Sequence, residues 1–320
     1  MNGESEVRAG DEILLRVAWF YYKDELTQEK IARLLSVSRA SVGRMLERAR
    51  KAGLVTIQLN SAYLASMELS SKLRSVFGLD DAIVIPDLED SAVNNRIGLG
   101  GAQLLSTLLK GETNLGIGFG QTVSQVVSAT DFNQTGNVRL VTLTGGVDGY
   151  LHPLVWSRAN VDEKEPTKAF VIPSPIVTST PQLAESLRVE PTIEAVLKRA
   201  RAVDIAVVGV GTPDRDSTIV EMGYLSVDDV ALLLERGVVG DILGQFFDAS
   251  GQVVTLPIHD RRIGIDLSEL KLIPRVIGVA GGIHKSEAIF AALQGNYLDA
   301  LVTDQAVAMR LLELAGHGHR

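Results

Sequence analysis

The chain has 320 residues, of which 46% are hydrophobic and 22% charged, and it contains no cysteine. The length favours two domains, and the lack of cysteine excludes disulfides, thiolate chemistry and cysteine-ligated zinc. No apolar run approaches the roughly 18 residues that a membrane helix needs, and the first ten residues lack the basic and apolar parts of a signal peptide. We therefore expect a cytoplasmic protein without a membrane partner.

Charge is unevenly distributed along the chain. The net charge is −8 at pH 7, yet residues 26–58 hold seven basic and two acidic residues, so this segment carries +5 and the remainder −13. A basic segment in an acidic protein is typical of a localised contact with a polyanion such as DNA. A solvated, charged helix face explains the pattern as well, and charge alone does not separate the two interpretations.

Apolar residues recur with helical spacing in three segments near the start of the chain. The predicted helices are Asp11–Tyr22, Gln28–Leu35 and a third that runs to about Lys51, with N-caps at Thr27 and Ser38 and a turn at Ser36–Val37. The apolar side of the first helix is expected to comprise Ile13, Leu14, Val17, Ala18 and Tyr21. The next stretch, Gly53–Leu59, alternates like a β-strand.

Two helices joined by so tight a turn predict a helix-turn-helix, in which the second helix braces the third and the third enters a major groove. Arg39 and Arg44 are able to bind phosphate or to pair with guanine, and the strand that follows would be a wing on the DNA backbone. A three-helix core without a DNA role shows the same apolar pattern. The candidate DNA-contacting residues are Thr27, Gln28, Ser38, Arg39, Ala40, Ser41, Arg44 and Arg48.

The sequence pattern changes after Leu59, which divides the chain into domains 1–59 and 60–320. A connecting helix is followed by short β-branched runs that alternate with helical segments, among them DAIVIP, VRLVTLTGG, DIAVVGVG, VVTLP and ALVTD. This alternation predicts an α/β fold, with a parallel sheet covered by helices on both faces and ligands bound at the carboxyl ends of its strands.

Glycines cluster where these strands are expected to end. The segments GIGFGQT, LTGG, VGVGTP and GVAGGIHK each follow a predicted strand, and Thr122 and Lys285 stand near the starts of the helices after the first and the last. Backbone N–H groups, a positive helix end and a lysine suit an anion. The segments match neither a GxGxxG fingerprint nor a P-loop, and turn geometry explains each glycine alone. Together they favour a phosphorylated small molecule.

Asp248, in the segment GDILGQFFDASG, is the acidic candidate beside this phosphate pocket. A carboxylate in that position would hold the hydroxyl groups of a sugar. An ordinary Asx turn before Gly251 explains the residue equally well, so both interpretations stay open.

Nearly the whole chain resembles the SorC family of bacterial transcription regulators, also called the DeoR-type sugar-binding group. The resemblance rests on LTQEKIARLLSVSRASVGRMLERARKAGLVTIQL and, in the family's order, on GIGFGQT, LTGG, VGVGTP, GDILGQFFDASG and AGGIHKSEAIFAALQGNYLDALVTDQAVAMRLLEL. It implies a winged helix-turn-helix domain and a Rossmann-like C-terminal domain shaped like sugar-phosphate isomerases and used as a sensor. Gly43 and Ser36 stand where relatives more often have serine and glycine, respectively.

The resemblance also implies a phosphorylated sugar or polyol as effector and assembly into dimers or tetramers. We therefore predict a DNA-binding regulator of a carbohydrate-catabolism operon that binds palindrome-like operator DNA as a homo-oligomer, is no enzyme and needs no cofactor or metal ion. The candidate effector-binding residues in the quoted motifs are Gly118, Gly120, Gln121, Thr122, Gly145, Gly146, Gly211, Asp248, Gly281, Gly282 and Lys285.

The alternative is a sugar-phosphate isomerase or deaminase with an accessory DNA-binding domain. Proton abstraction beside a carbonyl needs a base and an acid close to the bound sugar. Asp248 would be the base and His152 or His284 the acid, although a lone histidine is more often a solvated loop residue. The LTGG segment holds no lysine that could form an imine.

Overall fold

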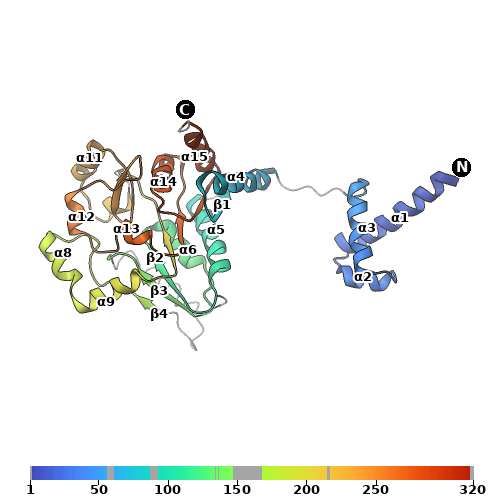
Figure 1. Ribbon diagram of the computed structural model, residues 1–320, viewed down its shortest axis with the longest axis horizontal. Helices are drawn as coiled ribbons and strands as arrows, with labels where there is room; N and C mark the ends of the chain where they lie inside the picture. Colours follow the sequence, from blue (N-terminus) through green and yellow to red (C-terminus); the bar gives the residue numbers. More distant parts are fainter. Residues whose placement is uncertain are drawn as a thin grey trace. The chain divides into compact units, whose positions relative to one another are not determined.

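Figure 1 shows a computed structural model of the protein, which describes residues 2–55, 61–86, 93–133, 135, 137–146, 168–214 and 217–317. The chain divides into two compact units, Met1–Asn60 and Ser61–Arg320. The strand predicted for the wing falls largely on residues 56–59, which lie outside the described residues, as does His152. In the part that is described, no helix has the length and apolar character needed to cross a membrane.

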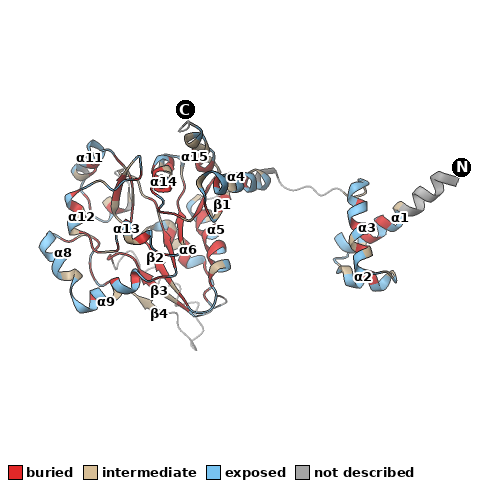
Figure 2. Cartoon of the chain, viewed as in Figure 1, coloured by how far each residue is buried: buried red, intermediate tan, exposed pale blue. Residues whose placement is uncertain are grey.

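The described part of the first unit is helical. Its elements are α1 (Asn2–Tyr22), α2 (Gln28–Leu34) and α3 (Arg39–Lys51). Both predicted N-caps are confirmed, because Thr27 Oγ1 accepts a hydrogen bond from Lys30 N (3.3 Å) and Ser38 Oγ accepts one from Ser41 N (3.1 Å). The helices enclose a small core of Leu14, Val17, Ala18, Ile31, Ala32, Val42, Leu46 and Ala49. Figure 2 colours the buried stretches of α1 and α3 red.

The turn between α2 and α3 contains Ser36 with a φ of +55°, in the left-handed region that favours glycine. Glycine would adopt this conformation without the strain that the β-carbon of Ser36 brings. Ser36 N donates to Arg33 O (3.3 Å) and Val37 N to Ala32 O (3.0 Å), so the turn keeps its backbone hydrogen bonds.

The prediction is wrong for two residues of α1 that we expected in the core. Ile13 is 43% exposed and Tyr21 is 36% exposed, whereas Leu14 is buried. A helix turns by about 100° per residue, so Ile13 points well away from the buried side that Leu14 occupies. The buried side of α1 is therefore narrower than the apolar pattern predicted.

The second unit contains a seven-stranded sheet in the order β1-β9-β8-β5-β2-β3-β4. All its neighbouring strands run parallel, with Leu115 of β2 aligned to Leu140 of β3 and to Ile205 of β5. The predicted α/β class with a parallel sheet is confirmed. The strands are β1 (Asp81–Ile85), β2 (Thr113–Ile117), β3 (Val138–Thr142), β4 (Lys168–Phe170), β5 (Ile205–Val208), β8 (Val276–Val279) and β9 (Ala300–Asp304).

Helices and one antiparallel hairpin connect these strands (Figure 1). The hairpin consists of β6 (Val238–Ile242) and β7 (Gln245–Asp248). The helices are α4 (Ser61–Phe77), α5 (Val93–Leu108), α6 (Gln121–Ala129), α8 (Pro181–Arg188), α9 (Pro191–Ala200), α10 (Thr218–Glu221), α11 (Val227–Glu235), α12 (Pro257–Arg261), α13 (Leu267–Leu270), η1 (Ile283–Lys285), α14 (Ser286–Gln294) and α15 (Gln305–His317). The segment VVTLP, predicted as a strand, forms only a single bridge, between Val253 and Phe247.

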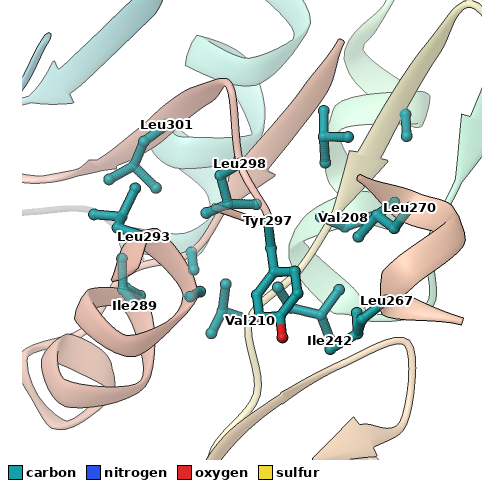
Figure 3. Close-up of a cluster of buried hydrophobic side chains, with 14 of the residues drawn as sticks. Val208, Val210, Ile242, Leu267, Leu270, Ile289, Leu293, Tyr297, Leu298 and Leu301 are labelled. Atoms are coloured by element: carbon teal, nitrogen blue, oxygen red, sulfur yellow. The ribbon is translucent and has the colours of Figure 1, made fainter. Parts of the chain in front are cut away.

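The central strands β5 (IAVV) and β8 (VIGV) are apolar throughout because both faces of the sheet are covered. Successive residues of a strand point to opposite faces, and β5 shows this directly. Ala206 and Val208 belong to one buried cluster, part of which appears in Figure 3, and Ile205 and Val207 belong to another. The two clusters are the cores on the two faces of the sheet.

The strand order reverses beside β2. From β2 the chain continues to β3 and β4 on one side, and then returns to β5 on the other side. In open α/β sheets, ligands bind outside the carboxyl ends of the strands at such a switch point. The topology therefore marks the ends of β2 and β5 as the place for a site.

Candidate functional site

A cavity of about 840 Å³ opens at this switch point. Its wall includes the segment Phe119–Val123 after β2, Gly209–Thr212 after β5, and parts of Gly281–Lys285 after β8. Pockets of this size suit small metabolites. Polar side chains complete the lining, namely Asn94, Thr144, Asp214, Ser217, Glu221 and Asp241.

The amino end of α6 forms one wall of the pocket. Its N-cap is Gly120, with a φ of +133°, and no side chain caps the helix. A β-carbon on Gly120 would meet nothing within 4 Å, so the backbone angle, and not lack of space, requires glycine. Gln121 and Thr122 also line the cavity, so the positive end of α6 lies at its wall. This arrangement is suited to an anion.

Lys285 stands on the opposite loop, at the N-cap of α14. The loop owes its shape to Asp304, whose Oδ2 accepts a hydrogen bond from Gly282 N (2.6 Å) and whose Oδ1 accepts one from Val307 N (2.9 Å). Position 281 requires glycine for lack of space, because a β-carbon there would lie 2.1 Å from Ile97 Cδ1. The lysine and the α6 terminus thus give the pocket two anion-attracting groups.

The sequence interpretation missed the acidic residues of the pocket, which are Asp214, Glu221 and Asp241, and Asp241 is the one with a strongly shifted pKa. Its Oδ2 accepts a hydrogen bond from Gly244 N (3.1 Å), and a β-carbon on Gly211 would lie 2.1 Å from its Oδ1. Burial raises the pKa of Asp241 from 3.8 to about 6, against the opposing effects of the Gly244 hydrogen bond and the positive charge of Lys285. Asp214 adds a further negative charge that raises this pKa.

Asp248, the acidic residue predicted from the same segment, does not line the pocket. Its Oδ1 accepts hydrogen bonds from Ser250 N (2.9 Å), Ser250 Oγ (2.6 Å) and Gln252 N (3.0 Å), and the bond from the Ser250 side chain is the main cause of its lowered pKa. The carboxylate closes an Asx-type turn. The effector-contact role given to Asp248 is therefore corrected in favour of the alternative interpretation, and Asp241 takes its place as the candidate.

Three of the predicted glycines, Gly118, Gly145 and Gly146, do not line the pocket. The N–H groups of Gly118, Gly145 and Gly146 donate to Val207 O (2.8 Å), Ile263 O (3.0 Å) and Ser174 O (2.7 Å). Because each of these N–H groups already donates to a backbone carbonyl, none of them is available to bind a phosphate. Gly145 is glycine because a β-carbon would lie 2.3 Å from Pro175 O.

Gly211 and Gly282 do line the pocket, but their N–H groups also have partners, Asp241 O (2.9 Å) and Asp304 Oδ2 (2.6 Å). Gly211 allows the Asp241 carboxylate to approach closely, whereas Gly282 has a φ of +94° and a β-carbon there would lie 2.7 Å from His284 Cε1. The predicted residues that the structure brings together around the cavity are therefore Gly120, Gln121, Thr122, Gly211, Gly281, Gly282 and Lys285.

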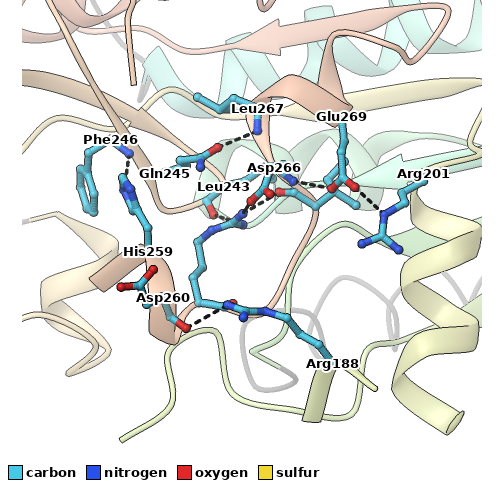
Figure 4. A network of polar contacts seen from close by, with 12 residues as sticks. Arg188, Arg201, Leu243, Gln245, Phe246, His259, Asp260, Asp266, Leu267 and Glu269 are labelled. Carbon is cyan, nitrogen blue, oxygen red and sulfur yellow. Dashed lines mark hydrogen bonds and ion pairs between the residues drawn. The ribbon is translucent and has the colours of Figure 1, made fainter. Parts of the chain in front are cut away.

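A buried arginine, Arg262, belongs to the polar network drawn in Figure 4, where its partners Leu243 and Asp266 are labelled. Arg262 is only 3% exposed, and it donates to Leu243 O (3.2 Å), to Ile265 O (2.9 Å) and to Asp266. Leu243 lines the cavity, so this network fixes the turn on which Asp241 and Gly244 sit. Nearby, His259 Nε2 accepts a hydrogen bond from Phe246 N (3.1 Å), and burial lowers the pKa of His259 to about 4.

The outward face of α3 carries the other predicted site. Arg39, Ala40, Arg44 and Arg48 are exposed, while Val42, Leu46 and Ala49 face the core. The hydroxyls of Ser38 and Ser41 lie 2.9 Å apart, and Arg44 Nη2 donates weakly to Ser41 Oγ (3.4 Å). The first turn of α3 thus presents arginines and hydroxyls together, as a major-groove helix does.

The two remaining predicted contacts lie at the start of α2. Thr27 is exposed and caps the helix, and Gln28 is half-buried. A β-carbon on Gly43 would lie 3.9 Å from Gln28 Oε1, which is ordinary contact, so the space between α2 and α3 does not require glycine at position 43. Among the described residues, no group of three or more metal-binding side chains occurs.

The chain thus combines a three-helix unit, in which a tight turn joins α2 and α3, with an α/β unit that has a pocket at the switch point of its sheet. Residues 61–313 match the family model described as “Putative sugar-binding domain”. The transcriptional regulator LsrR of Klebsiella pneumoniae is 40% identical over 311 residues, covering 96% of this chain and 94% of that protein. LsrR of Escherichia coli K12 is 41% identical over 306 residues, covering 94% and 95%.

Solved structures agree. The full-length sorbitol operon regulator SorC from Klebsiella pneumoniae has a TM-score of 0.71 at 27% identity, covering 94% of this chain and 98% of that one. A DeoR family transcriptional regulator from Listeria monocytogenes has a TM-score of 0.70 at 30% identity, covering 77% and 99%. The chain belongs to the SorC/DeoR family of transcriptional regulators with a sugar-binding domain.

Proposed function

We propose that the protein binds operator DNA through α3 and that a phosphorylated sugar or polyol in the pocket sets its affinity for that DNA. The operon controlled would serve carbohydrate catabolism. The observation that carries the proposal is a pocket lined both by anion-attracting groups and by carboxylate and hydroxyl oxygens, in a chain that also has an exposed arginine helix.

One set of groups in the pocket lining suits a phosphate. The amino end of α6 at Gly120–Thr122, which no side chain caps, and the ammonium group of Lys285 both favour a dianion. A second set suits hydroxyl groups, because Asp214, Ser217 and Asp241 offer carboxylate and hydroxyl oxygens, which accept hydrogen bonds from a polyol. A neutral sugar would leave the first set without a partner, and an inorganic phosphate would leave the second.

Control of DNA binding requires that the effector bind the DNA-competent and DNA-incompetent states with different affinity. A coupling free energy of about 1–3 kcal/mol would change operator affinity roughly 5–150-fold. Two copies of α3 in a homo-oligomer would read half-sites about one helical turn, or a multiple, apart, which corresponds to a palindrome-like operator.

The effector assignment is tested by thermal shift with phosphorylated and unphosphorylated forms of the same sugars and polyols. At a hundredfold excess over Kd, a ligand stabilises the folded state by about 2.7 kcal/mol. Lys285→Ala should abolish the shift with the phosphorylated form, whereas Lys198→Ala, an exposed lysine of α9 outside the pocket, should keep it. An undiminished shift in the Lys285 variant removes that lysine from the site.

The DNA assignment is tested by retardation of promoter fragments. Arg44→Ala should lose specific binding by at least tenfold, while Arg33→Ala, whose arginine pairs with Glu29 on α2, should change it little. The salt dependence of binding should be steep, because each phosphate contact releases a counterion. Equal operator affinity for the Arg44 variant and the native chain would refute α3 as the reading helix.

The enzyme alternative loses its proposed base, because Asp248 closes a turn away from the pocket. His284 does line the cavity, as does Asp241. Incubation with pentose and hexose phosphates is the direct test, and turnover that disappears in Asp241→Asn would establish catalysis in place of sensing.

A further inference from the structure

The outer side of α1 carries an exposed apolar stripe. Leu15, Trp19 and Tyr22 are 49%, 57% and 43% exposed, and their spacing of four and then three residues places them on one side of the helix. They border the side that Leu14 and Ala18 bury in the core. Single exposed apolar residues are ordinary, but three in one stripe with a tryptophan at its centre mark a contact surface.

Charged residues of opposite sign bound this stripe at its two ends. Glu12 lies one turn before Leu15 and Lys23 one turn after Trp19, and both are exposed. They are eleven residues apart, which is about three turns, so they share one edge of the helix and lie about 16 Å apart along it. Within the described part of the chain, neither side chain has an ion-pair partner.

We propose that this stripe is the site at which α1 packs antiparallel against α1 of a second copy of the chain. In a two-fold pair, residue i contacts j where j contacts i, so Glu12 meets Lys23 of the other copy on both sides of the axis. The midpoint of Leu15 and Tyr22 and the midpoint of Glu12 and Lys23 lie one residue apart, a rise of about 1.5 Å. One axis near residue 18 therefore satisfies the apolar and the charged contacts together.

The charge pattern selects both the occupant and the direction. A parallel copy in register would bring Glu12 to the level of Glu12 and Lys23 to the level of Lys23, which costs free energy, whereas the antiparallel copy pairs opposite charges. A partner with a uniformly charged surface would be repelled at one end of the stripe. A second copy matches both ends without any further chain.

This pairing goes beyond the proposed function and does not depend on it. The pairing involves α1 alone and is measured without DNA or effector. Its test is therefore independent of the roles proposed for Arg44 and Lys285. If the regulator binds a palindrome-like operator, the α1 pair supplies a two-fold relation between the two reading helices.

Cross-linking tests the proposal on the full-length chain, which contains no cysteine among the 320 residues. We expect Glu12→Cys/Lys23→Cys to form a covalent dimer with a short bis-maleimide whose reach is below 16 Å. Neither single variant should do so, because like positions lie on opposite sides of the axis, about 17 Å apart. Each chain's own pair of cysteines is also too far apart to react together.

Trp19→Ala in the double-cysteine background should reduce the dimer yield at least tenfold. Leu34→Ala, which removes an apolar side chain of α2 that is 62% exposed, should leave the yield unchanged. Three results would each overturn the proposal: no dimer from the double variant, a dimer from either single variant, or a yield that does not respond to Trp19→Ala. Hydrogen exchange of α1–α3 shows whether the Trp19 variant is still folded, and for an unfolded variant Trp19→Phe is used, with a smaller loss expected.

Discussion

Replacing Asp241 by asparagine should stabilise the protein without ligand while weakening effector binding. Burial holds the pKa of Asp241 at about 6, roughly two units above 3.8. A shift of one pKa unit corresponds to 1.36 kcal/mol. Above pH 6 the ionised carboxylate therefore destabilises the folded state of the second unit, Ser61–Arg320, by about 3 kcal/mol. Because asparagine keeps an oxygen that can accept from Gly244 N but has no charge to bury, the variant should lose most of this cost.

The sign of the pH dependence follows from the raised pKa. Between about pH 4 and pH 6 the folded state binds a proton that the unfolded state has released, so stability falls as the pH rises through this range and then stays level. The native chain should show this slope and Asp241→Asn should lack it. At pH 8 the variant should melt roughly 6–12 °C higher, given 2–4 °C per kcal/mol for a unit of this size.

Calorimetric unfolding of both proteins at pH 4.5, 6 and 8, without ligand, measures the effect. Asp248→Asn is the matched control, since its turn hydrogen bonds hold the pKa of Asp248 low, and that variant should be less stable than the native chain at pH 8. If the melting temperatures of the native chain and of Asp241→Asn differ by the same amount at all three pH values, burial of the ionised carboxylate does not lower stability by the free energy given above. Weaker effector binding by the more stable variant would show that the cost is retained for function.

Three further changes test the geometry of the turns. Gly120→Ala should lower stability by about 1–3 kcal/mol and reduce effector affinity, whereas Gly111→Ala, at a φ of +67° in an exposed turn, should lower stability only; thermal shifts with and without ligand separate the two. Ser36→Gly should stabilise the first unit by about 1 kcal/mol, seen as roughly fivefold slower hydrogen exchange in α2 and α3, and unchanged exchange would contradict the strain argument. Asp304→Asn turns one acceptor into a donor facing Gly282 N or Val307 N, and should weaken effector binding several-fold in calorimetric titration; equal affinity would mean that the loop keeps its shape without the bond.

The helices and strands that could be predicted are those specified by local pattern. The N-caps at Thr27 and Ser38, the α3 face and the parallel sheet follow from spacing and side-chain type alone. The exposure of Ile13 could not be predicted, because it depends on how much of α1 two short helices are able to cover. The strand predicted at Val253 does not form, because the segment pairs with β7 through a single bridge, to Phe247.

The pocket's place could be predicted because carboxyl ends of parallel strands meet at one edge, but its acidic residue could not. Asp241 and Asp248 stand in the same segment, and the hairpin of β6 and β7 with the bridge from Gly211 decides which of them reaches the cavity. Likewise, the sequence around Gly145 suggests a phosphate-binding glycine. In the structure, however, Gly145 N donates its hydrogen bond to the carbonyl oxygen of Ile263, more than a hundred residues later in the chain. Partners so distant in sequence leave no local signal.

The loop that carries Lys285 is linked to α4, the helix that begins the second unit. Asp304 joins Gly282 to the first turn of α15, α15 packs against α4, and Ser70 of α4 accepts a hydrogen bond from Val84 N of β1 (3.0 Å). A ligand shifts an equilibrium only by the difference between its affinities for the two states. If Lys285 takes the phosphate as proposed, the contact that distinguishes the states lies on a loop whose own anchor belongs to α15. In that case a change in the loop would pass to α4, the first helix of the second unit, through Asp304 and the packing of α15 against α4.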